Sequence, residues 1–171
     1  MYLIHFPILL ASLLLSPPPA VLASNNPTPP SSSSWCQPKH ISDHDQRALF
    51  TTYVDTIYTV KNFSAVPTYY AETYIQHNPT LPPGPYKLQE TLSFYFIKND
   101  VAVYRTAFDN SKGWVHMVLT SKEPDQEGKY PQTVVVDIFR WNGTCVQEHW
   151  DVVQAVPANK TNKLTMWGDG Y

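Results

Sequence analysis

The stretch QTVVVDIFRWNGTCVQEHWDVVQAV, residues 132–156, is the most informative about the fold of this chain. Two runs rich in β-branched and aromatic residues flank the pair Asn142–Gly143, a dipeptide typical of a type I′ turn between antiparallel strands. The stretch therefore predicts a long β-hairpin. Its second half also carries Glu148, His149 and Asp151, and such residues seldom lie within an apolar strand unless partners or a function keep them there.

The residues before the hairpin predict helices first and strands second. Ser42 is suited to cap a helix, Asp45 stands at the capping-box position, and apolar residues then recur at helical spacing. After Asp100 the pattern changes to that of strands. This order predicts an α+β fold in which N-terminal helices pack on one face of a strongly curved, mostly antiparallel sheet. Helices are expected over residues 43–61, 64–71 and 86–99, and strands over residues 73–77, 101–109, 114–121, 132–141 and 144–156.

The first 34 residues are expected to lie outside this domain. Residues 1–23 predict a secretory signal peptide, because an apolar run precedes Val21 and Ala23, small residues at positions −3 and −1 of a cleavage site. Residues 24–34 are rich in Pro, Ser and Asn and predict a flexible segment. We therefore expect a secreted, extracellular protein with one domain over residues 35–171 and no membrane association after cleavage.

The cysteines and the glycosylation signals fit the secretory route. Cys36 and Cys145 are the two cysteines of the chain, and an oxidising compartment would allow one disulfide, two buried free thiols being the alternative. Asn62, Asn142 and Asn159 each begin an acceptor triplet for N-glycosylation. The net charge is −2 and no Lys/Arg cluster is present, so no nucleic-acid partner is expected.

Three segments together resemble a known family. YIQHNP (74–79), VDIFRWNG (136–143) and EHWDVVQAVP (148–157) are similar in order and spacing to the SnoaL-like branch of the NTF2-like superfamily. The resemblance implies a cone, in which the curved sheet wraps a long helix around an apolar pocket. Members include polyketide cyclases, epoxide hydrolases of the limonene type, dehydratases, isomerases and non-catalytic binding modules, so the fold leaves the activity open.

The resemblance also assigns roles to residues of the hairpin. The catalytic carboxylate of the family's cyclases and epoxide hydrolases matches Asp151. Strand alternation puts His149 beside it on the pocket face, and an Asp–His pair can transfer a proton near neutral pH. The alternative is a structural hydrogen-bonded pair. The pocket face is expected to hold Cys145, Gln147, His149, Asp151 and Val153, and the outer face Val146, Glu148, Trp150 and Val152.

Further pocket residues are expected from other segments. His77 and His116 are predicted to converge with His149 and Asp151 as catalytic candidates. The positions that resemble the Arg and second acid of the epoxide hydrolases hold Trp114 and His116 here, which counts against that activity. The ligand-binding walls are expected to include Trp114, Ile75, Tyr53, Tyr74, Phe94 and Val153.

Three further expectations concern a metal, an ion pair and the oligomeric state. Several histidines with one Asp could form a two-histidine, one-carboxylate metal site, but the ligands would come from different strands, so we expect neither a metal nor another cofactor. Arg140 is expected to pair with Glu148 across the hairpin. The resemblance implies a homodimer through the outer sheet face, with Trp150 as an anchor.

The sequence thus predicts a secreted SnoaL-like protein with an apolar pocket for a hydrophobic small molecule. Its expected chemistry is cofactor-independent acid/base catalysis of the cyclase, isomerase or dehydratase type. The alternative is a non-catalytic ligand-binding or effector-like secreted module.

Overall fold

The computed structural model describes residues 35–162 and 164–168, so the predicted signal peptide and the Pro/Ser-rich segment lie outside the described residues. The predicted helices and hairpin strands are all present, although the second helix ends and the first strand begins earlier than expected. The elements are α1 (Asp43–Val54), η1 (Asp55–Thr59), η2 (Phe63–Ala65), α2 (Val66–Tyr69), β1 (Tyr70–Gln76), α3 (Leu88–Lys98), β2 (Asn99–Asp109), β3 (Lys112–Ser121), β4 (Gln132–Asn142) and β5 (Cys145–Ala155).

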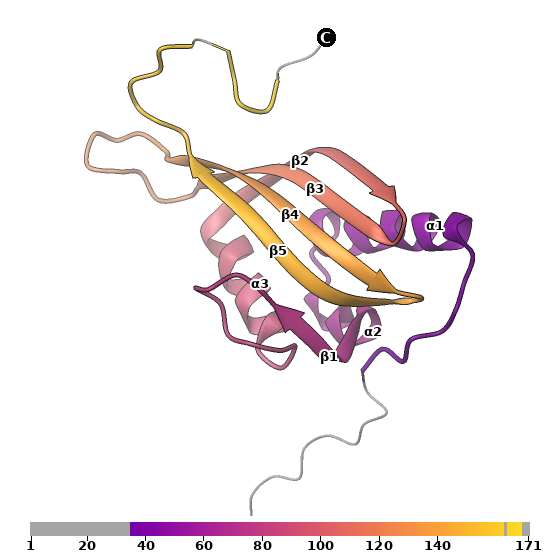
Figure 1. Ribbon diagram of the computed structural model, residues 1–171. Coiled ribbons are helices and arrows are strands. Elements are labelled where there is room, and N and C mark those ends of the chain that lie inside the picture. Colours follow the sequence, from indigo (N-terminus) through magenta and orange to yellow (C-terminus); the bar gives the residue numbers. More distant parts are fainter. Residues whose placement is uncertain (1–34, 163, 169–171) are drawn as a thin grey trace, which may run out of the picture.

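The strands form one five-stranded sheet in the order β1-β5-β4-β3-β2. β1 runs parallel to β5, and every other pair is antiparallel. Figure 1 shows β2–β5 as a curved sheet, with α1, α2 and α3 on one side of it. The predicted α+β fold with a curved, mostly antiparallel sheet is therefore confirmed. Among the described residues, no helix has both the length and the apolar character needed to cross a membrane.

Helix α1 begins where the sequence predicts. The Ser42 hydroxyl oxygen accepts a hydrogen bond from the Asp45 backbone N–H at 3.1 Å and donates to the Asp45 carboxylate at 2.8 Å, which satisfies one of the free donors of the first turn. The helix continues directly into η1, a π-helical turn that ends at Thr59, two residues before the predicted end. Its buried side packs against the sheet through Phe50 and Ile57.

Tyr53 lies at the centre of the core and does not line a pocket. Its side chain is fully buried, and its hydroxyl is hydrogen-bonded to the Tyr70 hydroxyl at 2.6 Å. The prediction that Tyr53 is a ligand-binding wall is therefore wrong, because its ring is enclosed by other aromatic rings. These neighbours are Phe50, Tyr58, Tyr69, Tyr70, Phe139 and Trp141.

The β4–β5 turn differs by one residue from the expected turn. Asn142 pairs with Cys145, so the loop is Gly143–Thr144, and the expected type I′ turn at Asn142–Gly143 is not formed. Of the two loop residues, Gly143 alone has a positive φ, +54°, as a type II′ turn requires at its first central residue. A Cβ atom at Gly143 would come within 2.0 Å of the Lys39 carbonyl oxygen, so the N-terminal segment also demands glycine here.

A bulge in β5 changes the predicted faces of its first residues. Arg140 pairs with Glu148 but Trp141 pairs with Val146, so Gln147 is an extra residue in the ladder. Val146 is consequently buried in the core on the same side as His149, and the expectation that it faces outward is wrong. Gln147 instead donates to the Thr73 carbonyl at 2.8 Å. From Glu148 onward the predicted alternation holds.

A disulfide joins Cys36 to Cys145, as the sequence led us to expect. The two residues are 109 positions apart, and their Cα atoms are 5.8 Å apart. The bridge ties the segment before α1 to the first residue of β5. Cys36 also forms an isolated parallel bridge with Ala71 and donates its backbone N–H to the Tyr70 carbonyl at 3.1 Å.

Removing this disulfide should destabilise the domain. A Cys36→Ser, Cys145→Ser double variant is expected to lose about 2–5 kcal/mol of unfolding free energy, because the bridge restricts a long loop in the unfolded chain. Urea unfolding followed by tryptophan fluorescence measures the loss. Dithiothreitol should lower the stability of the wild type to a similar degree and leave the double variant unchanged; a sensitive double variant would contradict the assignment.

Gly143→Ala should cost more stability than the matched substitution Gly128→Ala. Gly128 also has a positive φ, +76°, but no atom lies within 4 Å of the point that a Cβ atom would occupy there. The backbone conformation should cost about 1 kcal/mol in both variants, and the contact with Lys39 should raise the cost at Gly143 to at least about 2 kcal/mol. Equal losses of unfolding free energy in chemical denaturation would show that the segment of residues 36–39 moves away from the added methyl group at little cost.

Candidate functional site

A cavity of about 420 Å³ lies between the sheet and α3. Its walls come from η1, β1, the loop after β1, α3, β3, β4 and β5, and they are mostly aliphatic and aromatic. Leu92, Tyr95 and Phe96 supply the helical wall, and Met117 and Val135 face them from the sheet. Of the described residues that line the cavity, none is Lys or Arg. This size and character suit a small organic ligand.

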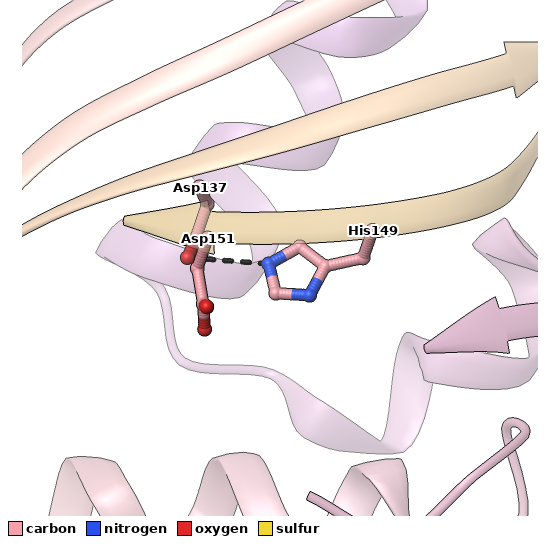
Figure 2. Close-up of side chains that lie close together, drawn as sticks. All are labelled: Asp137, His149 and Asp151. Atoms are coloured by element: carbon pink, nitrogen blue, oxygen red, sulfur yellow. Dashed lines mark ion pairs between the residues drawn. The ribbon is translucent and has the colours of Figure 1, made fainter. Parts of the chain in front are cut away.

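Three ionisable side chains meet at one end of this cavity. Asp137 on β4 and Asp151 on β5 are directly opposite each other in the ladder, and His149 lies one inward position before Asp151. Each offers a carboxylate oxygen or an imidazole nitrogen within 4.8 Å of the other two. Figure 2 shows them close together, with the imidazole directed at Asp137. The expected inward position of His149 and Asp151 is therefore confirmed, and a third residue, Asp137, joins them.

Asp137 and His149 form the buried part of this cluster. They are 8% and 7% exposed, and Asp137 Oδ1 lies 3.2 Å from His149 Nε2. The Tyr58 hydroxyl donates to Asp137 Oδ2 at 2.5 Å. Burial, reinforced by the negative charge of Asp137, raises the pKa of Tyr58 well above its ordinary value. Tyr58 therefore stays protonated and holds one oxygen of Asp137 in place.

Gln76 determines which atoms of His149 carry protons. Its Oε1 accepts from the Asn78 backbone N–H at 3.0 Å, and its Nε2 donates to the Tyr74 hydroxyl at 3.0 Å, so its orientation is set by its neighbours. His149 Nδ1 lies 2.9 Å from that same Oε1 and must therefore be the donor. The second ring nitrogen, Nε2, faces Asp137 Oδ1 at 3.2 Å.

Asp151 is the more accessible carboxylate. The Asn78 side-chain amide donates to Asp151 Oδ2 at 2.5 Å, and Asn78 Oδ1 accepts from the Thr80 backbone N–H at 2.8 Å. Among the described residues, Asn78 is the one hydrogen-bond donor to Asp151, so Oδ1 is left for a ligand. A loop amide therefore orients the carboxylate whose free oxygen faces the cavity.

The same cluster is the one group of described His, Cys, Asp and Glu residues close enough together to hold a metal ion. It contains one histidine and two carboxylates, so it differs from the two-histidine set considered from the sequence. Tyr58, Gln76 and Asn78 already give each of its members a hydrogen-bond partner within the protein. These contacts form a connected polar network in which Asp151 Oδ1 is the oxygen left without a partner among the described residues.

His77 and Ile75 do not line the cavity, so their predicted inward position is wrong. Tyr74 and Gln76 face inward on β1, and alternation directs Ile75 and His77 to the other side. His77 stacks on Trp150 with ring centroids 4.5 Å apart, and its Nε2 lies 3.1 Å from Glu148. The sequence contained a warning, because Tyr74 and Ile75 could not both face a pocket from one regular strand.

Trp114 and His116 also lie on the outer side of the sheet. Their neighbours Val115 and Met117 belong to the core, so the predicted inward position of Trp114 and His116 is wrong by one residue of alternation. The Arg105 guanidinium donates to His116 Nδ1 at 3.1 Å. Burial and then this guanidinium lower the pKa of His116. Of the four catalytic candidates, His149 and Asp151 therefore meet in the cavity, and His77 and His116 do not join them.

Helix α3 presents a different face from the one predicted for Phe94. Phe94 is 60% exposed and does not line the cavity, whereas Leu92 and Tyr95 do. Tyr74 and Val153 are at the cavity wall as expected. The residues that sequence reasoning missed are Tyr58, Gln76, Asn78 and Asp137. For Asp137 the sequence did hold an indication. Asp137 and Arg140 must lie on opposite faces of one strand, and Arg140 was expected to pair with the outward-facing Glu148.

On the outer face the predicted Arg140–Glu148 pair is confirmed. Arg140 Nε donates to Glu148 Oε1 at 2.8 Å, and an Nη2 hydrogen bond to the same oxygen accompanies it. These bonds lower the pKa of Glu148; burial opposes the effect, and the hydrogen bond with His77 adds to it. The outer face thus holds its own ion pair, separate from the cavity cluster.

Glu148→Gln should destabilise the protein only where Glu148 is ionised. A lowered folded-state pKa gives stability that is present above the ordinary glutamate pKa of about 4.3 and is lost as the pH falls through the folded value. The difference in melting temperature between wild type and variant should therefore be largest near neutral pH and vanish in acid. Glu90→Gln, on an exposed helical pair with Lys87, should change little at any pH. A difference for Glu148 that persists in strong acid would contradict the ionic origin.

No protein-family model matches the sequence, and no curated protein matches it. Solved structures do match. A SnoaL-like polyketide cyclase from Agrobacterium tumefaciens is 12% identical, with a TM-score of 0.50, and the match covers 67% of this chain and 92% of that one. An NTF2-like protein of unknown function from Cytophaga hutchinsonii is 7% identical, with a TM-score of 0.52 and coverage of 64% and 99%. The resemblance drawn from the sequence is thus confirmed at the level of the fold: this chain has the NTF2-like fold found in SnoaL-like polyketide cyclases.

Proposed function

We propose that the cavity binds a hydrophobic small molecule and catalyses a cofactor-independent acid/base reaction on it, of the cyclase, isomerase or dehydratase type. One observation carries this proposal. Asp151 directs a carboxylate oxygen without a protein partner among the described residues into a mostly apolar cavity, beside the paired side chains of His149 and Asp137. A base and an acid therefore lie within reach of one bound molecule.

The two groups suit complementary steps. Asp151 Oδ1 can remove a proton from a carbon next to a carbonyl group, which leaves the electron pair of that C–H bond in an enolate. The proton between His149 and Asp137 can then be given to the substrate, at carbon in an isomerisation or at a departing hydroxyl in a dehydration. Asp137, held by Tyr58, would stabilise the imidazolium form of His149 and keep the ring in position.

Secretion is part of the proposal. The Cys36–Cys145 disulfide is typical of an oxidising compartment, and the predicted leader would deliver the chain there. Asn62, Asn142 and Asn159 are exposed and so accessible to glycosylation. Under this proposal residues 24–34 connect the leader to the domain that begins at Trp35.

A non-catalytic binding or effector-like module is the second candidate. It is favoured by the hydrogen bonds that fix each member of the cluster, which can serve as a rigid polar surface that orients a ligand. It is also favoured by Trp114 and His116, which the resemblance matches to relay positions of the epoxide hydrolases and which do not line the cavity.

We also propose that two copies associate through the outer sheet face. Ile75, Trp114 and Val152 are apolar side chains exposed on that face, and Trp150 stacks with His77 among them. Apolar area of this kind is typical of protein contact surfaces.

The decisive experiment compares binding with turnover. The ligand that co-purifies with the secreted protein is identified by mass spectrometry and offered to the wild type and to Asp151→Asn. At saturating ligand the variant should lose turnover by about 100-fold or more, because the amide cannot accept the proton. Glu148→Gln, the same change on the opposite face of β5, is the matched control and should keep both ligand binding and turnover. Full turnover in Asp151→Asn would remove Asp151 from the mechanism. If the wild type binds the ligand without turning it over, and Asp151→Asn loses that binding, the binding module is favoured.

A further inference from the structure

The charge of the cavity distinguishes it from an ordinary apolar pocket. Its lining includes the carboxyl groups of Asp137 and Asp151 and the imidazole of His149, without a Lys or Arg among the described lining residues. Asp137 has the His149 imidazole beside it at 3.2 Å, whereas the hydrogen-bond donor to Asp151 among the described residues is the neutral Asn78 amide. An ionised Asp151 then leaves the cavity with a net negative charge that no cation among the described lining residues balances.

The neighbouring strand residues do not offset the negative charge of these carboxyl groups. Asp137 and Asp151 are direct cross-strand neighbours, an arrangement that is unfavourable for two like charges. The nearest guanidinium on β4, that of Arg140, faces the other side of the sheet and is engaged by Glu148. Charge in a site of low dielectric is costly unless an opposite charge or hydrogen-bond donors accompany it. A bound cation would supply that opposite charge.

The other walls suit the body of an organic cation better than a bare ion. Six aromatic side chains line the cavity, namely Tyr58, Tyr70, Tyr74, Tyr95, Phe96 and Phe139, and aromatic faces attract organic cations. Burial, followed by the charges of Asp137 and Asp151, raises the pKa of Tyr74, which indicates that the negative field extends along the wall.

We propose that the natural ligand of this cavity carries a protonated amine on an aromatic or aliphatic body. The ammonium group would lie at the Asp137–Asp151 end and be held by the negative charge there, while the apolar body fills the space between α3 and the sheet. This inference rests on the proposed function, since it takes the cavity as the ligand site. It also implies discrimination, because a ligand with a carboxylate at the same end would be repelled.

Three indole probes of similar size and different charge test the proposal. Tryptamine is cationic, tryptophol is neutral and indole-3-acetate is anionic near neutral pH. Isothermal titration calorimetry on the full secreted protein should give a dissociation constant for tryptamine at least about tenfold below that for tryptophol. Indole-3-acetate should bind the most weakly of the three.

Variants locate the source of the preference. Asp151→Asn should reduce the preference for tryptamine over tryptophol by about tenfold while leaving the affinity for tryptophol nearly unchanged. Glu148→Gln carries the same chemical change on the other face of β5 and should keep the wild-type preference. Thermal unfolding checks each variant. Asp151 is half-buried, so its carboxylate can be changed without touching the buried Asp137–His149 pair.

The outcomes separate this inference from the proposed function. Equal affinities for tryptamine and tryptophol would overturn the amine preference and leave the cavity as a neutral ligand site. A preference that survives in folded Asp151→Asn would also overturn it, because the cation would then be recognised elsewhere. Absence of binding by all three probes at millimolar concentration would count against both the amine proposal and the cavity as a ligand site.

Discussion

The register between β4 and β5 is the constraint that positions the core, the cavity and the outer face together. It places Asp137 opposite Asp151 and Phe139 opposite His149, so all three ionisable side chains reach the same side of the sheet. Side chains alternate with a period of two along a strand, and a slip of one residue would exchange every inward group for an outward one. The Gly143 turn and the bulge at Gln147 hold this register, and the Cys36–Cys145 bridge fastens its closed end.

The sheet therefore separates two kinds of chemistry. The inner side holds a hydrogen-bonded acid/base cluster at the end of a largely apolar cavity. The outer side holds the Arg140–Glu148 ion pair and the stacked rings of His77 and Trp150. Both sets come from overlapping segments of sequence, and only alternation keeps them apart. This separation lets the outer pair add stability without supplying a positive charge to the cavity.

The cavity cluster depends on neutral partners. Tyr58 holds one oxygen of Asp137, Gln76 fixes the tautomer of His149, and Asn78 holds one oxygen of Asp151. Neutral donors orient carboxylates without cancelling their charge, so an ionised carboxylate keeps its negative charge and the cavity-facing oxygen of Asp151 stays available. An arrangement of this kind is suited to moving a proton and to receiving a positively charged group.

The disulfide was expected from the presence of two cysteines, and the inward direction of His149 and Asp151 from the resemblance. Local patterns in the sequence were enough to predict the α+β class, the approximate extents of the helices and strands, and that His149 and Asp151 share a face. These features depend on periodicity, capping and turn chemistry, which neighbouring residues carry among themselves. The residues that complete the site could be found only in the folded chain. The parallel pairing of β1 with β5 turned Gln76 inward and His77 outward, and the fold brought Tyr58 to Asp137 from 79 positions away.

The same distinction explains why some residues were assigned to the wrong face of a strand. Val146 faces the core because a bulge, invisible to a regular alternation, shifts the ladder by one residue. Trp114 and His116 face outward because their strand pairs with β4 in a register that places Val115 and Met117 in the core. Alternation along a strand shows which residues share a face, but packing of the whole core chooses which of the two faces is buried.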